Sequence, residues 1–290
     1  MTASHGNEIM VVSGASTGIG AATARELAAR GFHVLAGVRR ERDGDAIRGD
    51  GVEPVILDLT RPEHVRALAD RIASDPRHRP LRALVNNAAI SVNAPAEVLP
   101  LDEWRRLFDV NLFGHIAITQ ALLPFLHRSH GRIVNISSVG GKIAMATYGA
   151  YAGAKFALEA VSDSLRRELA PHGVQVVVVE PGAVRSEMAG RGAATANDLA
   201  AMMNPEQRRR YGGLIEAVVA HSLAFTRNGL PSARAGAVIA DAATVRRPRT
   251  RYTVGRDAAL LTRLARFLPD RVLDRIAAAN LRPYLPRQGT

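Results

Sequence analysis

The sequence predicts an α/β fold, a doubly wound sheet of about seven parallel strands with helices on both faces. Short apolar runs typical of buried strands alternate with longer segments of helical periodicity along most of the chain. The first strand, Glu8–Ser13, leads directly into a glycine-rich turn and a helical pattern that ends at about Arg30. We therefore expect one domain over residues 1–255, with a C-terminal helical extension of the same domain over residues 256–290.

The remaining elements continue this alternation. Strands are expected at Phe32–Val38, Pro54–Leu57, Leu81–Val85, Gly131–Ser137, Val174–Val179 and Arg251–Val254. Helices are expected at Pro62–Ser74, Leu101–His127, from about Ala150 to Ala170, and at Ala233–Val245, Asp257–Leu268 and Asp270–Leu281. Polar or glycine-containing segments follow most of these strands. We expect them to meet at the carboxyl edge of the sheet, where ligands bind in such folds.

The glycine-rich turn after the first strand is a candidate phosphate-binding element. Glycines allow a tight turn and let the backbone approach a phosphate group, which then lies at the amino terminus of the next helix. The spacing is G-x-x-x-G-x-G rather than the commoner G-x-G-x-x-G, and such a turn can also be a plain connector. Its place between a strand and a helix favours dinucleotide binding. The candidate residues are Gly14, Ser16, Thr17, Gly18, Ile19 and Gly20.

The second strand ends on Arg39 rather than on an acidic residue. In sheets that prefer NAD, an acidic side chain near this point binds the ribose 2′-hydroxyl. An arginine can instead pair with a 2′-phosphate. The sequence therefore predicts NADP(H) rather than NAD as the cofactor. The alternative is that Arg39 is one exposed arginine among many.

A serine, a tyrosine and a lysine form the candidate catalytic group. Tyr151 lies 13 positions after Ser138, and Lys155 lies four positions after Tyr151. On a helix, Tyr151 and Lys155 share one face, where the cation would lower the pKa of the phenol and allow proton transfer near neutral pH. A tyrosine and a lysine at this spacing can also be two exposed residues without a function. However, Lys142 and Lys155 are the only lysines, because the other 36 of the 38 basic residues are arginine.

Composition limits the other functional classes. The 290-residue chain has 47% hydrophobic residues, as globular proteins do, and a net charge of +11. Its arginines are dispersed, with short clusters at Arg208–Arg210 and between Arg246 and Arg251 that lack interleaved aromatics, so we do not predict nucleic-acid binding. The chain has no cysteine, and no metal site is expected. No transmembrane run or signal peptide is recognised, and the expected location is cytoplasmic.

Taken together, these motifs resemble the short-chain dehydrogenase/reductase family over residues 8–186, with weaker similarity to about Gly255. The resemblance rests on Gly14-x-x-x-Gly18-x-Gly20, Asn86-Asn87-Ala88, Asn111, Ser138, Tyr151-x-x-x-Lys155 and Pro181-Gly182. It implies a Rossmann domain, an oxidoreductase that interconverts a carbonyl and an alcohol, and a homodimer or homotetramer formed through the helices of Asn111 and Tyr151. Segments such as YAGAKFALEAVSDSLRREL look most like the hydroxysteroid/retinol dehydrogenase-like branch, which implies a bulky hydrophobic substrate.

The resemblance also implies a role for each matching residue. Tyr151 would be the general acid/base, Lys155 would lower its pKa and hold the nicotinamide ribose, and Ser138 would polarise the substrate oxygen. Asn111, in a helix kink, would hold a water that continues the proton relay. The other residues would contact the cofactor: Asp58 and Leu59 at the adenine, Asn86 and Ala88 at the adenosine side, and Pro181, Gly182, Val184 and Ser186 around the nicotinamide. Asn86 would also tie the sheet together.

Three positions depart from the usual family pattern without removing a catalytic group. Ser13 stands where threonine is usual, Ala89 replaces a glycine, and Ser186 stands where threonine is commoner. Tyr148 is not the predicted acid/base, because the residue four positions after it is an alanine.

The C-terminal half leaves alternatives open. Residues 186–230 carry apolar residues at helical spacing that fit either ordinary core or a lid over an apolar substrate. Arg191 or Arg208–Arg210 could instead pair with an acidic substrate. The C-terminal helices could pack on the body, meet a second subunit or touch a membrane surface. The alternative functions are a cofactor-binding sensor or scaffold without turnover, and a dehydratase or epimerase that uses the same cleft.

Overall fold

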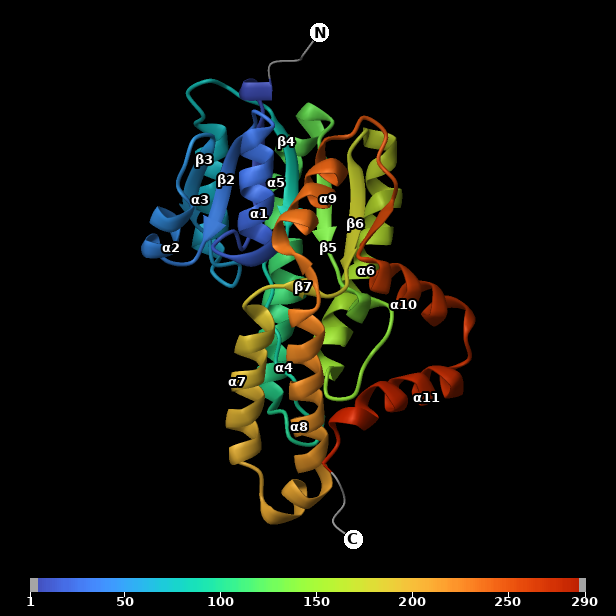
Figure 1. Ribbon diagram of the computed structural model, residues 1–290. Coiled ribbons are helices and arrows are strands. Elements are labelled where there is room, and N and C mark those ends of the chain that lie inside the picture. The colour runs from blue at the N-terminus through green and yellow to red at the C-terminus, as the bar shows by residue number, and fades with distance from the viewer. Residues whose placement is uncertain (1–4, 287–290) are drawn as a thin grey trace.

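The computed structural model describes residues 5–286 and contains a seven-stranded parallel sheet (Figure 1). The strand order is β3-β2-β1-β4-β5-β6-β9. These strands are β1 (Ile9–Val12), β2 (His33–Val38), β3 (Val52–Ile56), β4 (Leu81–Asn86), β5 (Arg132–Ile136), β6 (Gln175–Pro181) and β9 (Arg251–Val254). The order reverses between β1 and β4, and a ligand crevice is expected at such a switch point. The predicted doubly wound parallel sheet is confirmed.

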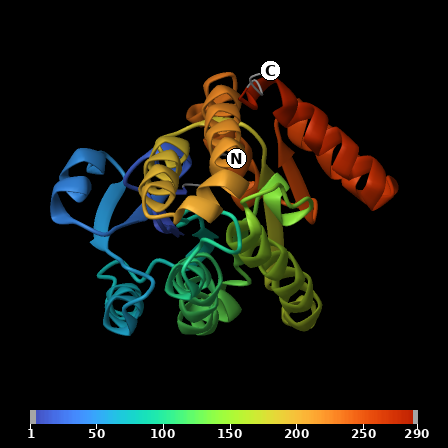
Figure 2. The same ribbon diagram turned by 90° about the horizontal axis from the view of Figure 1, so that it is seen from below.

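Helices cover both faces of the sheet, as the view along the strands shows (Figure 2). On one face, α1 (Gly18–Ala29) packs against α9 (Ser232–Thr244). The other face carries α3 (Pro62–Ala73), α5 (Gly114–Ser129) and α6 (Gly149–Leu169). The remaining helices are α2 (Glu41–Ile47), α4 (Leu101–Phe108), α7 (Met188–Ala201), α8 (Pro205–Arg227), α10 (Arg256–Phe267) and α11 (Asp270–Leu281).

The central strands are apolar on both faces because each face packs against helices. In β1, Met10 and Val12 belong to the core under α1 and α9, whereas Ile9 and Val11 belong to the core under α3 and α5. All four side chains are fully buried. Successive side chains of a strand point to opposite faces of the sheet, so β1 contributes to both cores. Continuous apolar runs are typical of strands that are covered on both faces.

The expected bounds change most around β3. This strand begins at Val52 and ends at Ile56, so it starts earlier than expected and Leu57 lies outside it. Helix α2 was not predicted, because its sequence ERDGDAI is short, charged and interrupted by Gly44. Asp58 therefore lies two residues after the end of the strand rather than directly after it.

The helix predicted over residues 101–127 is interrupted. It consists of α4, a π-helical turn at Asp109–Phe113, and α5, which ends at Ser129. Gly114 follows the wide turn, and a Cβ atom there would lie 2.6 Å from the Cβ of Leu59. Glycine therefore allows α5 to approach the end of β3. Such π turns are frequent at functional sites.

Residues 184–231 form a helical hairpin that projects beyond the carboxyl edge of the sheet (Figure 1). A short parallel sheet of β7 (Val184–Arg185) and β8 (Leu230–Pro231) closes its base, and this sheet was not predicted. Helix α8 starts with a capping box, in which Asn204 accepts a hydrogen bond from the Gln207 amide and the Gln207 side chain accepts one from the Asn204 amide.

The C-terminal helices α10 and α11 lie close to their expected bounds and extend to one side of the hairpin (Figure 1). Helix α11 contacts α8, and the ring of Tyr284 lies edge-on to the ring of His221. Within residues 5–286, no helix is both long enough and apolar enough to cross a membrane.

Candidate active site

A cavity of about 580 Å³ opens at the carboxyl edge of the sheet. Its walls come from the glycine turn, the ends of β2 to β6, the α7–α8 hairpin and the C-terminal helices. Of the predicted site residues, it brings together Gly14, Ser16, Thr17, Gly18, Ile19, Gly20, Arg39, Asp58, Leu59, Ala88, Ser138, Tyr151, Lys155, Pro181, Gly182, Val184 and Ser186. Asn86 and Asn111 do not line it.

The glycine turn forms a cradle that only glycine permits. Gly14 and Gly18 have φ angles of +65° and +59°, which other residues rarely adopt. A Cβ atom on Gly20 would lie 2.2 Å from the carbonyl oxygen of Gly14. Thr17 caps helix α1 without a side-chain hydrogen bond to it, so the first amides of α1 are free to bind an anion. The turn therefore fits the pyrophosphate of a dinucleotide.

Ser13 and Asn87 hold this turn against the segment that follows β4. The Ser13 hydroxyl accepts hydrogen bonds from the amides of Asn87 (3.0 Å) and Ala88 (3.1 Å). The Asn87 side chain donates to the carbonyl oxygens of Ser13 (3.0 Å) and Gly14 (3.1 Å). The serine that replaces the usual threonine thus supplies the hydroxyl, as expected.

Arg39 lies at the rim of the cavity, where its side chain is exposed. Among residues 5–286 it forms no hydrogen bond or ion pair, so its guanidinium is available to a ligand. Asp58 lies nearby and accepts hydrogen bonds from the amide (3.0 Å) and the hydroxyl (2.7 Å) of Thr60. Partial burial raises the pKa of Asp58, but these hydrogen bonds and the charge of Arg39 outweigh it and leave the pKa below its ordinary value.

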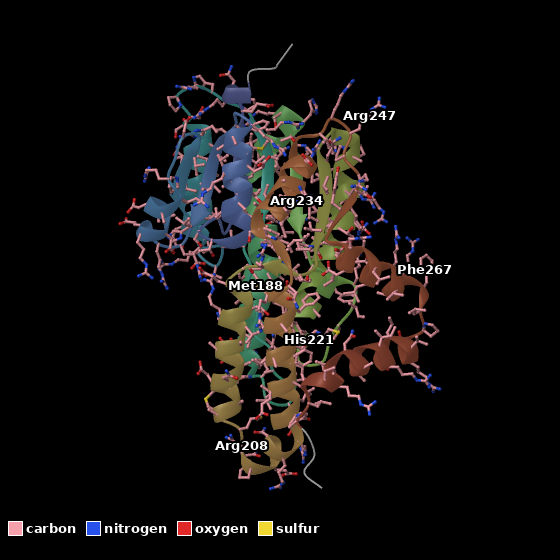
Figure 3. The ribbon with its side chains drawn as sticks, viewed as in Figure 1. Met188, Arg208, His221, Arg234, Arg247 and Phe267 are labelled. Atoms are coloured by element: carbon pink, nitrogen blue, oxygen red, sulfur yellow. The ribbon has the colours of Figure 1, made fainter. Side chains whose placement is uncertain are left out.

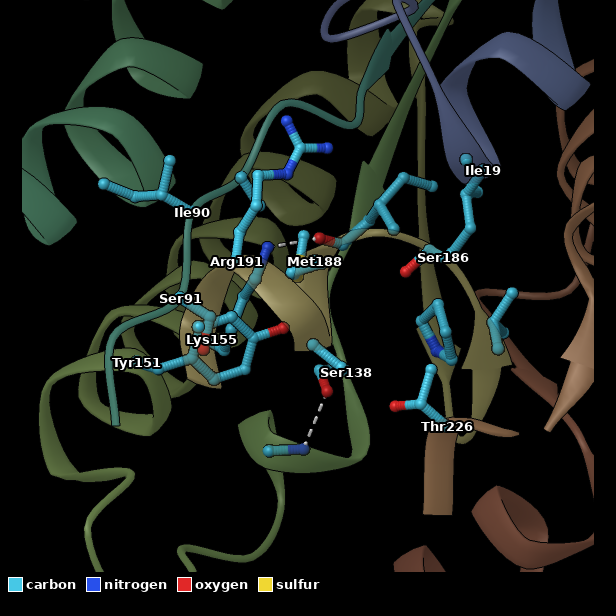
Figure 4. Close-up of a pocket in the computed structure, with 18 of the residues that line it drawn as sticks. Ile19, Ile90, Ser91, Ser138, Tyr151, Lys155, Ser186, Met188, Arg191 and Thr226 are labelled. Carbon is cyan, nitrogen blue, oxygen red and sulfur yellow. Dashed lines mark hydrogen bonds between the residues drawn. The ribbon is translucent and has the colours of Figure 1, made fainter. Parts of the chain in front are cut away.

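Ser138 and Tyr151 direct their hydroxyl groups into the same part of the cavity (Figure 4). Ser138 follows β5 and accepts a hydrogen bond from the Gly140 amide at 3.0 Å. Tyr151 lies in the first turn of α6, one turn before Lys155, as predicted. Burial raises the pKa of Tyr151 above its ordinary value, although interaction with the Ser138 hydroxyl opposes this rise. The expectation of a lowered Tyr151 pKa is thus wrong for the protein by itself, because burial disfavours the phenolate more strongly than its surroundings favour it.

Lys155 is almost completely buried, at 1% exposure. Its Nζ donates a hydrogen bond to the carbonyl oxygen of Ile136 at 2.7 Å and lies 5.9 Å from the centre of the Tyr151 ring (Figure 4). Burial lowers the pKa of Lys155 to about 8, and the charge of Glu159 offsets this only in part. A lysine in this state can exchange a proton near neutral pH.

Lys142, the other lysine, forms ion pairs within the fold. Lys142 pairs with Glu159 at 2.7 Å and with Glu180 at 3.6 Å, and both carboxylates are buried. Arg251 contacts the same two carboxylates, at 3.0 Å and 3.4 Å. Lys142 therefore ties the loop after Ser138 to the end of β6, whereas Lys155 faces the cavity.

Asn86 and Asn111 act inside the fold rather than at the cavity. Asn86 is fully buried and donates hydrogen bonds to Thr119 and Asn135, so it does tie the sheet together. At the cavity, where Asn86 was expected, the structure has Asn87 instead. Asn111 lies in the π turn and exchanges two hydrogen bonds with the backbone of Ile90 (2.8 and 2.9 Å). Its predicted water contact stays a prediction.

The hairpin and the C-terminal helices complete the cavity. Met188, Val218 and Phe225 add apolar surface from α7 and α8, and Leu261 and Leu281 add it from α10 and α11. Other apolar residues of the hairpin, such as Met203 and Ile215, form a small core, so part of this region is ordinary core. Its use as a lid over a substrate stays a prediction. The wall from α10 and α11 was not predicted, because periodicity shows an apolar face but not its partner.

The arginine clusters lie away from this cavity. Arg208 lies at the far end of the hairpin and Arg247 at the opposite end of the molecule (Figure 3). Arg210 pairs there with Glu97 and Glu206. The alternative in which Arg208–Arg210 bind an acidic substrate at this site is therefore wrong, whereas Arg191 does line the cavity.

The two lysines should respond oppositely to removal of their charge. A change in the Lys155 pKa from 10.5 to about 8 corresponds to a cost of about 3 kcal/mol for its charged form. This cost is present below pH 8 and disappears as the pH rises through 8 toward 10.5, because the folded state then binds fewer protons than the unfolded state. Lys155→Met should therefore raise the melting temperature at pH 7, and the gain should vanish near pH 10.

Lys142→Met is the matched control. It should lower the melting temperature, because it removes a partner of two buried carboxylates. Thermal unfolding of both variants against pH is the measurement. A Lys155→Met protein less stable than the wild type at pH 7 would contradict the buried-charge account.

Comparisons with known proteins agree with this architecture. A family model described as short chain dehydrogenase matches residues 8–197. Mouse retinol dehydrogenase 5 is 36% identical over 277 residues, which are 91% of this chain and 86% of that protein. A short-chain dehydrogenase structure from Streptomyces avermitilis has a TM-score of 0.72 at 30% identity and covers 94% of each chain. A metagenomic short-chain oxidoreductase in complex with NADP has a TM-score of 0.66 at 26% identity, over 86% of this chain and 96% of that one. The chain therefore belongs to the short-chain dehydrogenase/reductase family, as an oxidoreductase of its retinol dehydrogenase-like branch.

Proposed function

We propose that this protein is an NADP(H)-dependent oxidoreductase that interconverts a carbonyl and an alcohol on a bulky hydrophobic small molecule. The observation that carries the proposal is the meeting of the Ser138 and Tyr151 hydroxyls in one cavity, with the buried Lys155 ammonium behind them and the glycine cradle beside them. The steroid-, retinoid- or lipid-like character of the substrate rests on the apolar wall from the hairpin and the C-terminal helices. The retinol dehydrogenase named above supports the same class.

Proton transfer follows from the states of the two hydroxyls. In the reducing direction, the Ser138 hydroxyl hydrogen-bonds the substrate carbonyl oxygen and Tyr151 gives that oxygen its phenolic proton. The raised pKa of Tyr151 keeps the proton on the phenol until transfer. The Lys155 ammonium then stabilises the phenolate that remains. A bound nicotinamide would supply the hydride that the carbonyl carbon accepts.

Arg39 supports the choice of NADP(H). It follows β2 at the rim of the cavity with a free guanidinium, and the residues directly after this strand are Arg39 and Arg40 rather than the acidic residue that binds a ribose 2′-hydroxyl in sheets that prefer NAD. Leu59, Ala88 and the side of the glycine turn would border the adenosine. Pro181, Gly182, Val184 and Ser186 would frame the nicotinamide, since they line the cavity at the end of β6.

We also propose an oligomeric state and a cellular location for the protein. Leu101, Phe113 and Phe156 are large apolar side chains with more than 40% exposure on α4, the π turn and α6. They support a homodimer or homotetramer formed through these helices. Leu260 and Phe267 are exposed on α10 and would allow a weak membrane-surface contact. The proposed location is cytoplasmic.

Tyr151→Phe tests the mechanism. It should lower kcat by about 10²- to 10⁴-fold, because the phenolic proton donor is lost, while NADPH binding stays unchanged. The measurement is NADPH oxidation against a panel of hydrophobic ketones and aldehydes, with cofactor binding followed by fluorescence. Tyr148→Phe removes a neighbouring phenol as the control and should keep kcat within a few fold. Unchanged turnover in Tyr151→Phe would rule out the mechanism, and NADPH binding without turnover of any panel member would favour the sensor alternative.

Arg39→Ala tests the cofactor choice. It should weaken NADPH binding about 10-fold and leave NADH binding unchanged, because only NADPH carries the 2′-phosphate. Arg40→Ala is the control, since Arg40 is also exposed but does not line the cavity. Fluorescence titrations of both variants with both cofactors measure the effect. A wild type that prefers NADH would show that the interpretation of Arg39 is wrong.

A further inference from the structure

Arg191 connects helix α7, which is the first helix of the hairpin and which we call the lid helix, to the glycine turn. Its Nη2 atom donates a hydrogen bond to the Thr17 hydroxyl at 3.2 Å, although the two residues are 174 positions apart. The side chain lines the cavity (Figure 4) and is 60% exposed. It also pairs with Glu187, one turn earlier on α7, at 3.1 Å. A residue of the hairpin thus reaches the part of the cavity that the turn forms.

The surroundings of this guanidinium favour an anion. Thr17 caps helix α1, whose first amides have no side-chain partner and lie at the positive end of the helix dipole. Arginine has five N–H donors in a rigid fork that matches phosphate oxygens, and only Nη2 of Arg191 is engaged, by Thr17 and Glu187. Glu187 also lines the cavity and would repel an anion, so its pairing with Arg191 reduces that repulsion.

We propose that Arg191 binds the pyrophosphate of the dinucleotide from the lid side, opposite the amino terminus of α1. This inference rests on the proposed cofactor and extends it to a residue of the lid. Its hydrogen-bond partner Thr17 belongs to the glycine turn, so an anionic group bound by that turn suits Arg191 better than an acidic substrate does. Because α7 also contributes Met188 and Thr195 to the cavity wall, cofactor binding would hold the wall of the substrate pocket in place.

The inference assigns two arginines to two anionic groups. Arg39 at the end of β2 would bind the 2′-phosphate, and Arg191 on α7 would bind the pyrophosphate. Two fragments separate these contacts. ADP-ribose carries the pyrophosphate without a 2′-phosphate, whereas adenosine 2′-monophosphate carries a 2′-phosphate without the pyrophosphate.

The experiment is a titration of the full-length wild type, Arg191→Ala and Arg39→Ala with both fragments, by competition against bound NADPH. Arg191→Ala should weaken ADP-ribose binding about 10-fold and leave adenosine 2′-monophosphate unchanged. Arg39→Ala should show the reverse pattern. Added salt should reduce the Arg191 effect, because the contact is exposed. Arg191→Lys should recover part of the affinity, since it keeps the charge but loses the fork.

Arg209→Ala is the matched control, because it removes an exposed arginine of the same hairpin that does not line the cavity. It should leave the binding of both fragments unchanged. Equal ADP-ribose affinities for Arg191→Ala and Arg209→Ala would overturn the inference, as would an equal loss for both fragments in Arg191→Ala. A wild type that binds neither NADPH nor ADP-ribose would instead overturn the proposed cofactor function itself.

Discussion

The buried ammonium of Lys155 is the interaction on which the arrangement of the site depends. Its hydrogen bond to the Ile136 carbonyl connects α6 to the end of β5, and this connection fixes Tyr151 beside Ser138. Water would solvate the ammonium far better, so the fold accepts a cost in stability for keeping it there. Sites that trade stability for chemistry in this way are common in enzymes. Lys142, with its buried carboxylate partners, shows the contrasting case in the same chain.

Around Tyr151 and Lys155, the apolar wall of the cavity and its glycine cradle come from different parts of the molecule. The hairpin and the C-terminal helices supply Met188, Phe225 and Leu281 to the cavity wall, whereas the sheet edge supplies the glycine cradle and Arg39. The net charge of +11 suits an anionic cofactor, since long-range attraction raises its local concentration. The chain shares this cofactor-binding edge with the short-chain dehydrogenase/reductase family to which it belongs.

Much of this architecture could be predicted because parallel strands place their carboxyl ends together. The residues expected after each strand, from the glycine turn to Ser138 and Pro181, do line one cavity. Predictions that needed three-dimensional surroundings were less accurate. The pKa of Tyr151 depends on burial that spacing does not reveal. Neighbouring strand-end residues alternate in direction, so Asn87 rather than Asn86 reaches the cavity. The contribution of α11 to the cavity arises from packing between distant segments. The π turn, in contrast, lies at Asn111, where the family resemblance implied a helix kink.

The protonation state of Lys155 decides whether a buried ammonium organises this site, and it is measurable because the chain has only two lysines. In NMR spectra of protein labelled with ¹³C at the lysine Cε, the two lysines give two signals. The Lys142→Arg variant keeps only the Lys155 signal and so identifies it. We expect the Lys155 amine to have a pKa of about 8, well below the ordinary value of 10.5, because burial disfavours its charged form. A Lys155 signal that titrates at or above 10.5 would contradict the buried ammonium, and with it the role assigned to Lys155 in proton transfer.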